Sequence, residues 1–138
     1  MSEIPDIFKE SALTSILVVQ DLKKSIGFYR DVLGASLYRE YGGDSAVFEF
    51  LSSWILLVSP GEPTEDKPDT RFVTPPDPNG VSHAFTIRVQ NCRESYRELL
   101  ARGAKFITPP FDRGAETRCF FRDPDGHLFE ISEYRTPT

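Results

Sequence analysis

The sequence predicts an α+β fold made of two copies of one β-α-β-β-β module. A helix pattern near residues 21–34 recurs near residues 91–103, and strand patterns surround both helices in the same order. The capping residues Asp21 and Asn91 are 70 positions apart, and the glycines that end the helices, Gly34 and Gly103, are 69 apart. A repeat at about half the chain length of 138 residues indicates an internal duplication.

The first helix is predicted to begin after Asp21, because an aspartate side chain can accept hydrogen bonds from free N–H groups of the first turn. Apolar residues then recur at helical spacing: Leu22, Ile26, Tyr29, Val32 and Leu33. Gly34 is typical of the residue that ends a helix.

The second helix repeats this pattern, with Asn91 as the cap and Glu94 three residues later, as in a capping box. Its apolar stripe consists of Cys92, Tyr96, Leu99 and Leu100. Gly103 ends it.

Strands are predicted where apolar and β-branched residues alternate with polar ones between turn residues. In the first half they are expected at 14–19, 36–40, 46–51 and 54–59. In the second half they are expected at 82–89, 105–108, 118–122 and 128–132. The stretch 60–80 holds six of the eleven prolines and indicates an exposed linker. We therefore expect one domain, 1–138, with a first module at about 12–60, a linker at 61–81 and a second module at about 82–135.

Composition excludes several classes of partner. The chain has 16 basic and 21 acidic residues, a net charge of −5, so neither nucleic acid nor an anionic membrane is expected. Its apolar runs are far shorter than the ~20 residues of a membrane-spanning helix.

The N-terminus lacks the pattern of a signal peptide. Cys92 and Cys119 are the only cysteines, which favours a cytoplasmic protein with two reduced, buried thiols.

Two motifs resemble a known family. The first is Val19-x-Asp21-Leu22-x-x-Ser25-x-x-Phe28-Tyr29-x-x-Val32-Leu33-Gly34, and the second is Phe121-x-Asp123-Pro124-Asp125-Gly126-x-x-x-Glu130. With the paired module order, they resemble the vicinal oxygen chelate superfamily of glyoxalases, bleomycin-resistance proteins and extradiol dioxygenases. The resemblance spans about residues 13–134. It implies a cup-shaped, half-barrel site between two curved sheets.

In metal-dependent relatives, four strand positions of this cup carry the ligands. The resemblance places them here at Thr14, Leu56, Ala84 and Glu130, of which Glu130 alone is a good ligand. No metal or other cofactor is therefore expected. His83 lies one residue out of register, so alternation places it on the helix side of its strand, whereas a β-bulge would bring it into the cup. If a divalent metal does bind, its ligands would be Glu130 and His83.

Alternation also predicts which side chains face the cup. The full set is Thr14, Ile16, Val18, Trp54, Leu56, Val58, Ala84, Thr86, Arg88, Phe120, Arg122, Leu128, Glu130 and Ser132. Eight of them are the expected ligand-binding residues: Thr14, Trp54, Leu56, Ala84, Thr86, Arg88, Phe120 and Glu130. Glu130 would act as a ligand-binding carboxylate or general base, or would form an ion pair with Arg88. An apolar lining with few polar groups suits a small organic or aromatic molecule, although the same side chains could fill a closed core.

Three functions remain open from the sequence. The first is sequestration of a small molecule without chemistry, as in bleomycin-resistance proteins, by a homodimer. The second is a lyase, isomerase or dioxygenase that uses Glu130 with His83. The third is an interaction module with a collapsed cup. The missing ligands at Thr14 and Ala84 favour the first over the second.

Overall fold

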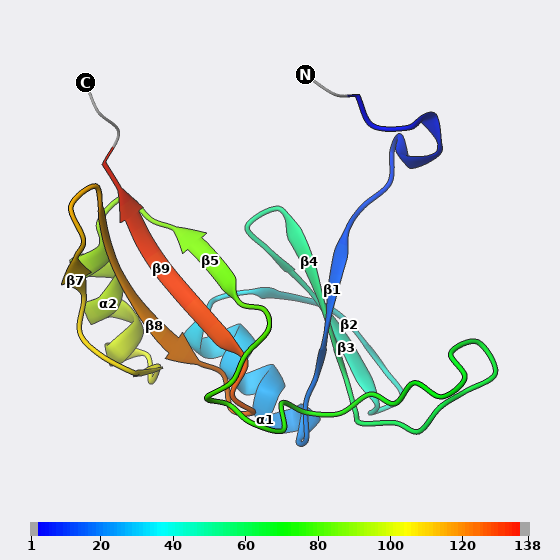
Figure 1. Ribbon diagram of the computed structural model, residues 1–138. Coiled ribbons are helices and arrows are strands. Elements are labelled where there is room, and N and C mark those ends of the chain that lie inside the picture. Colours follow the sequence, from blue (N-terminus) through cyan, green and yellow to red (C-terminus); the bar gives the residue numbers. More distant parts are fainter. Residues whose placement is uncertain (1–2, 136–138) are drawn as a thin grey trace.

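The computed structural model describes residues 3–135 and contains two mixed β-sheets (Figure 1). The N-terminal sheet has the order β1-β4-β3-β2. Its strands are β1 (Thr14–Val18), β2 (Ser36–Tyr41), β3 (Ser45–Phe50) and β4 (Ser53–Val58). The C-terminal sheet has the order β5-β9-β8-β6, and β7 pairs with β8. Its strands are β5 (Phe85–Arg88), β6 (Lys105–Phe106), β7 (Phe111–Asp112), β8 (Glu116–Arg122) and β9 (Leu128–Tyr134).

The two sheets share one connectivity. In each, the first strand pairs in parallel with the last, β1 with β4 and β5 with β9, and the remaining pairs are antiparallel. The α+β fold class is therefore confirmed. The module limits at 12–60 and 82–135 stay a prediction. Among the described residues, no helix combines the length and apolar character needed to cross a membrane.

The helices begin where the caps predict. The side chain of Asp21 accepts a hydrogen bond from the Lys24 N–H before α1 (Leu22–Gly27), and Asn91 does the same for Glu94 before α2 (Cys92–Ala101). A short 3₁₀ turn, Asp6–Phe8, precedes β1. The predicted first helix is not α-helical throughout, because α1 continues as a π-helix over Phe28–Val32.

Two strand predictions also need correction. β5 begins at Phe85 rather than at residue 82, because its neighbour β9 begins at Leu128 and the first ladder pair joins Phe85 to Phe129. At this register residues 82 and 83 lie opposite the turn before β9, and Ala84 forms no ladder pair. β6 ends at Phe106 because the prolines at 109 and 110 have no N–H group for a ladder.

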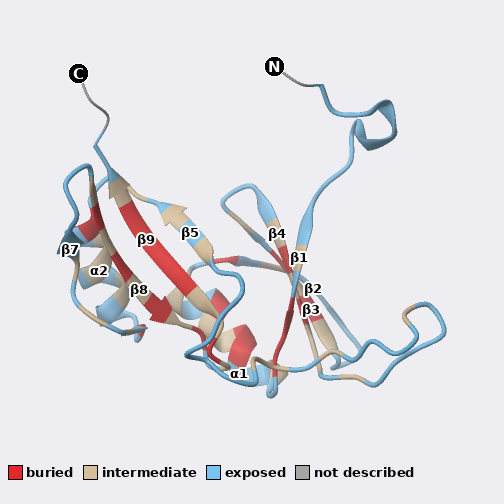
Figure 2. Cartoon of the chain, viewed as in Figure 1, coloured by how far each residue is buried: buried red, intermediate tan, exposed pale blue. Residues whose placement is uncertain are grey.

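One hydrophobic core joins the two modules. The strand faces that carry the helices supply most of the buried residues (Figure 2): Leu17, Phe48, Leu57, Cys119, Phe121, Phe129 and Ile131. Tyr29 is fully buried, with its ring centroid 6.0 Å from that of Phe48 and 6.1 Å from that of Phe129. One aromatic side chain of the first module thus contacts both sheets.

The turn before β9 fastens the second module to α1. The Asp123 carboxylate is buried and accepts hydrogen bonds from the Tyr29 hydroxyl at 2.7 Å and from the N–H groups of Asp125 and His127. Asp125 accepts from the Gln20 N–H at 3.0 Å. Burial raises the pKa of Asp123, and that of Tyr29 even more. This turn is therefore a structural joint.

The two cysteines are free and buried, as predicted. Burial raises the pKa of the Cys92 thiol and raises that of Cys119 to about 12. Neither thiol has the lowered pKa of a reactive cysteine.

Candidate functional site

The candidate site lies on the strand faces turned away from the helices. Because side chains alternate along a strand, burial of Leu17, Leu57 and Ile131 against the helices puts their strand neighbours on the opposite side. We call this side the open face of each sheet. On the C-terminal sheet it includes Thr86, Arg88, Glu116, Arg118, Phe120, Arg122, Glu130 and Ser132.

Glu130 is the most constrained carboxylate of this face. It is 8% exposed, and its Oε1 accepts a hydrogen bond from Thr86 Oγ1 at 2.7 Å. Its Oε2 lies 3.9 Å from the Arg118 Nε. Phe120 pairs with Glu130 across the β8–β9 ladder and is half-buried. The carboxylate is therefore held in one position by a hydroxyl and a guanidinium.

A second polar group lies farther along β9. Ser132 is fully buried and donates its hydroxyl to Glu116, and the Arg88 guanidinium donates to Ser132 Oγ at 2.8 Å. Glu116 also lies 3.4 Å from both Arg88 and Arg118. The hydrogen bond from Ser132 and the two guanidiniums lower the pKa of Glu116. The open face thus carries two arginines and two glutamates in one connected network.

These contacts correct one expectation. Arg88 does not form the expected ion pair with Glu130, because it reaches Glu116 and Ser132 instead. Arg118 is the charged partner of Glu130. It was not named from the sequence, although the alternation that places Phe120 and Arg122 on the open face also places Arg118 there. Glu116 was missed because the predicted strand begins two residues after it.

The open face of the N-terminal sheet has another character. Thr14 pairs with Trp54, and Ile16 pairs with Leu56. The Tyr38 ring meets the Trp54 ring edge-on at 5.4 Å. Ile16 is 49% exposed and Tyr38 is 62% exposed. Along β1 and β4 this face is apolar and aromatic, with Glu49 opposite Trp54 and Arg39 opposite Val47 on the strands beside them, and it lies at the surface of the single chain.

His83 and Ala84 do not lie on a strand. Both precede β5 and are exposed, so the strand assignment of Ala84 is wrong, and its role in binding a ligand stays a prediction. The His83 ring meets the Phe85 ring edge-on at 4.9 Å, on the side of the strand that alternation indicated. His83 also lines a cavity of about 260 Å³ beside β1 and the linker.

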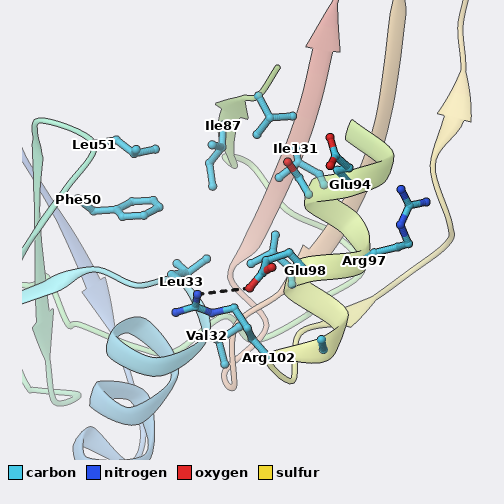
Figure 3. Close-up of a pocket in the computed structure, with 14 residues that line it drawn as sticks. Val32, Leu33, Phe50, Leu51, Ile87, Glu94, Arg97, Glu98, Arg102 and Ile131 are labelled. Atoms are coloured by element: carbon cyan, nitrogen blue, oxygen red, sulfur yellow. Dashed lines mark ion pairs between the residues drawn. The ribbon is translucent and has the colours of Figure 1, made fainter. Parts of the chain in front are cut away.

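A larger hollow, of about 720 Å³, lies on the helix side between the modules. Figure 3 shows Phe50 and Leu51 from the β3–β4 hairpin opposite Ile87 and Ile131 of the C-terminal sheet. At its edge, Arg102 pairs with Glu98 at 3.7 Å. None of the eight predicted ligand-binding residues lines this hollow.

The donor set does not fit a metal centre. Within residues 3–135, no group of three or more histidines, cysteines, aspartates or glutamates could hold an ion. The four positions implied by the resemblance hold a threonine, a leucine, an alanine and one carboxylate, Glu130. A transition metal normally takes three or more nitrogen, sulfur or oxygen ligands from the protein.

Comparison with known proteins identifies the family. Residues 12–131 match the model of the Glyoxalase/Bleomycin resistance protein/Dioxygenase superfamily. The chain belongs to this superfamily. It is also 32% identical to the metallothiol transferase FosB of Shouchella clausii (strain KSM-K16) over 118 residues, which cover 82% of this chain and 73% of that protein.

Solved structures of the superfamily share the fold. A lactoylglutathione lyase from Agrobacterium tumefaciens matches with a TM-score of 0.68 and 19% identity, over 95% of this chain and 96% of that one. A superfamily protein from Nocardioides matches with a TM-score of 0.71 and 21% identity, over 100% of this chain and 89% of that one. At these identities the likeness concerns the fold alone.

Proposed function

We propose that the chain binds a small organic molecule against the open face of the C-terminal sheet, without a metal ion, and that Glu130 recognises it. One observation carries this proposal. Glu130 is nearly buried on an open face, and its carboxylate is held there by Thr86 and Arg118. A carboxylate fixed in this way is positioned to accept hydrogen bonds from a ligand.

The neighbouring side chains suggest the chemistry of that ligand. Phe120 lies beside Glu130 and offers a ring surface. Arg88 is exposed next to Ser132 and offers guanidinium donors. We expect a molecule with an aromatic or apolar body and a hydroxyl, amide or ammonium group that donates to Glu130. Binding without chemistry corresponds to sequestration, the first of the three functions that the resemblance leaves open.

We propose that a second copy of the chain completes the cup. The helix faces of both sheets contribute to the shared core, so the ligand of Glu130 can be enclosed only from the side of the open faces. The open face of the N-terminal sheet is apolar and exposed at Ile16 and Tyr38. In a homodimer, Thr14, Trp54 and Leu56 of one chain would lie opposite Glu130 of the other. We also propose a cytoplasmic location, since both cysteines are free.

The experiment is a thermal-shift screen with metal analysis of protein purified without chelator or tag. We expect far less than one equivalent of metal and no stabilisation by Zn²⁺, Mn²⁺ or Ni²⁺. Bleomycin and small aromatic amines and phenols are the probes, and at least one should raise the melting temperature. The shift should disappear in Glu130→Gln and persist in the control Glu133→Gln, since Glu133 is the next acidic residue of the same strand. Stoichiometric metal that is lost in Glu130→Ala would overturn the proposal.

A metal-dependent transferase or lyase is the second candidate. It is supported by the printed name of the relative, metallothiol transferase, at 32% identity. Such an enzyme would use Glu130 with His83, which lies two residues before β5. The same metal analysis separates the two candidates, because this one requires bound metal that both Glu130→Ala and His83→Ala remove.

A further inference from the structure

A cavity of about 810 Å³ lies at the joint between the modules and contains no residue of either open face except Arg122, the last residue of β8. Both modules form its wall, which includes Lys24, Phe28 and Val32 from the first and Lys105, Phe106 and Arg122 from the second. Its volume lies in the range of about 300–1,000 Å³ that small-molecule sites occupy. The cavity is therefore large enough for a ligand of its own.

Gly27 is the first observation that indicates a ligand-binding site in this cavity. It is the last residue of α1 and lines the cavity, with a regular helical φ of −58°. A Cβ atom built at this position would meet no heavy atom within 4 Å. Glycine inside a helix costs about 1 kcal/mol relative to alanine. Neither its backbone conformation nor close packing requires this glycine, and the position of its missing side chain beside the cavity is open space.

The π-helix is the second sign. It follows Gly27 directly, and three of its five residues, Phe28, Asp31 and Val32, line the cavity. Isolated π-turns are rare and occur frequently at functional sites, because the wider turn re-aims the side chains it carries. The irregular part of the first helix is therefore the part that borders the cavity.

Three cationic side chains of the wall have no carboxylate partner among the described residues. Within residues 3–135, neither Lys24 nor Lys105 uses its Nζ in an ion pair or hydrogen bond. Arg122 donates to the carbonyl oxygens of Pro78 and Gly126 and has no carboxylate partner among the described residues. Three cationic side chains thus line the cavity without a counter-charge of their own.

The acidic residues of the wall are already occupied. Asp123 accepts from the Tyr29 hydroxyl, Asp125 accepts from the backbone of Gln20, and Asp31 pairs with Arg30 at 2.9 Å. Apolar surface comes from Phe28, Val32, Phe106, Ile107 and Pro78. The wall therefore combines apolar surface with three cations and three hydrogen-bonded carboxylates, and the Nζ atoms of Lys24 and Lys105 are the charged groups left without a partner among the described residues.

We infer that this junction cavity binds a planar aromatic anion, a carboxylate or a phosphate ester. Its ring system lies against Phe28 and Phe106, and its anionic group lies near Lys24 and Lys105. Because residues of both modules contact the ligand, binding stabilises the folded joint. The site is independent of Glu130 and of the proposed open-face ligand.

The experiment is isothermal titration calorimetry of the full chain with 2-naphthoate, 2-naphthyl phosphate and the neutral 2-naphthamide. At least one anion should bind saturably with a stoichiometry of one per chain. The double variant Lys24→Gln/Lys105→Gln should weaken anion binding at least tenfold and leave binding of the amide within threefold. Lys23→Gln, an exposed lysine of the same helix outside the cavity, and Glu130→Gln are the controls and should bind like the original chain.

Steric variants test the place of binding. Gly27→Leu should reduce anion affinity at least tenfold, and Gly27→Ala should reduce it less while raising the melting temperature. If Gly27→Leu does not fold, Gly27→Ala still decides, because higher stability with weaker binding fits only a ligand beside that residue. No saturable binding of either anion at millimolar concentration would overturn the inference. Binding that neither the lysine pair nor Gly27→Ala changes would overturn it as well.

Discussion

The two open faces occupy the same register but have opposite chemistry. On the N-terminal sheet Ile16 pairs with Leu56, and on the C-terminal sheet Thr86 pairs with Glu130. Ile16 and Thr86 each lie five residues before the helix cap of their module, so the two pairs are equivalent positions of the duplicated unit. The helix-facing sides, in contrast, remain apolar in both modules.

This contrast shows where the duplicated unit could diverge. Residues that face the helices contribute to one shared core, so a polar change on either sheet would leave an unsatisfied group in the same interior. The open faces carry no such constraint. On the C-terminal sheet the charged residues around Glu130 pair with one another, Glu130 with Arg118 and Glu116 with Arg88. A single charge placed on the N-terminal face would find none of these partners.

The largest expected effect comes from substitutions on the helix-facing sides of the two sheets, which should contribute equally to one core. Phe48→Ala and Phe121→Ala should each lower the free energy of unfolding by about 3–5 kcal/mol, because both side chains are fully buried in the common core. Urea denaturation followed by circular dichroism measures this, and each variant should unfold in one transition. Two separated transitions would show that the modules are independent. Ile16→Ala, on an open face, is the control and should cost much less.

The second expected effect tests the apolar face. Leu56→Glu should raise the dissociation constant of the proposed homodimer at least tenfold, because it places a lone carboxylate on the surface that meets the second copy. Sedimentation velocity over a concentration series measures it. Glu130→Leu, the reciprocal change on the other sheet, should abolish the ligand-dependent thermal shift. A dimer of unchanged affinity in Leu56→Glu would place the interface elsewhere.

A smaller effect is expected at the threonines of the first strands. Thr86→Val should lower the free energy of unfolding by about 1 kcal/mol, because it removes the hydrogen bond to the nearly buried Glu130 carboxylate. Thr14→Val is the matched change in the N-terminal sheet, where the side chain is exposed, and should stay within about 0.5 kcal/mol. Equal losses in urea denaturation would mean that the Thr86 hydrogen bond contributes nothing.

The smallest effect concerns pH. The pKa of Glu116 is lower in the folded chain than in the unfolded one, so its ionised form favours the fold. That stability is present at neutral pH and is lost as the pH falls from about 5 through the folded pKa. The stability of Glu116→Gln should therefore change less between pH 7 and pH 3 than that of the original chain. Glu49→Gln, an exposed residue of the N-terminal sheet, should not alter the profile.

The sequence predicted the parts of the fold that depend on local pattern. Caps at Asp21 and Asn91 and the order of strands follow from short-range rules, and both caps form the expected hydrogen bonds. The start of β5 was wrong because it depends on where β9 begins, about 40 residues away. Alternation assigned Thr86, Leu56 and Glu130 to one side of their strands, in agreement with the ladder.

The candidate site was harder to predict because charge pairing is a property of three strands together. Arg88 and Arg118 are equally plausible partners for Glu130 by alternation, and only the side-chain geometry assigns Arg118. The joint made by Tyr29 and Asp123 also lay beyond local pattern, because these residues are 94 positions apart. The wide turn of the π-helix carries no propensity signal at all.

That wide turn accounts for the unequal spacing of the repeat. From cap to terminal glycine the first helix spans 13 positions, Asp21 to Gly34, and the second spans 12, Asn91 to Gly103. The bond from the Leu33 N–H to the Phe28 carbonyl closes a turn with one residue more than an α-helical turn. An alignment of the two halves therefore needs a one-residue gap. The π-helix contains the extra residue, and the helix keeps its cap at Asp21 and its terminal glycine at Gly34. Deletion of one residue from 28–32 would give the two helices the same length from cap to terminal glycine. It would also change the angle between the two modules.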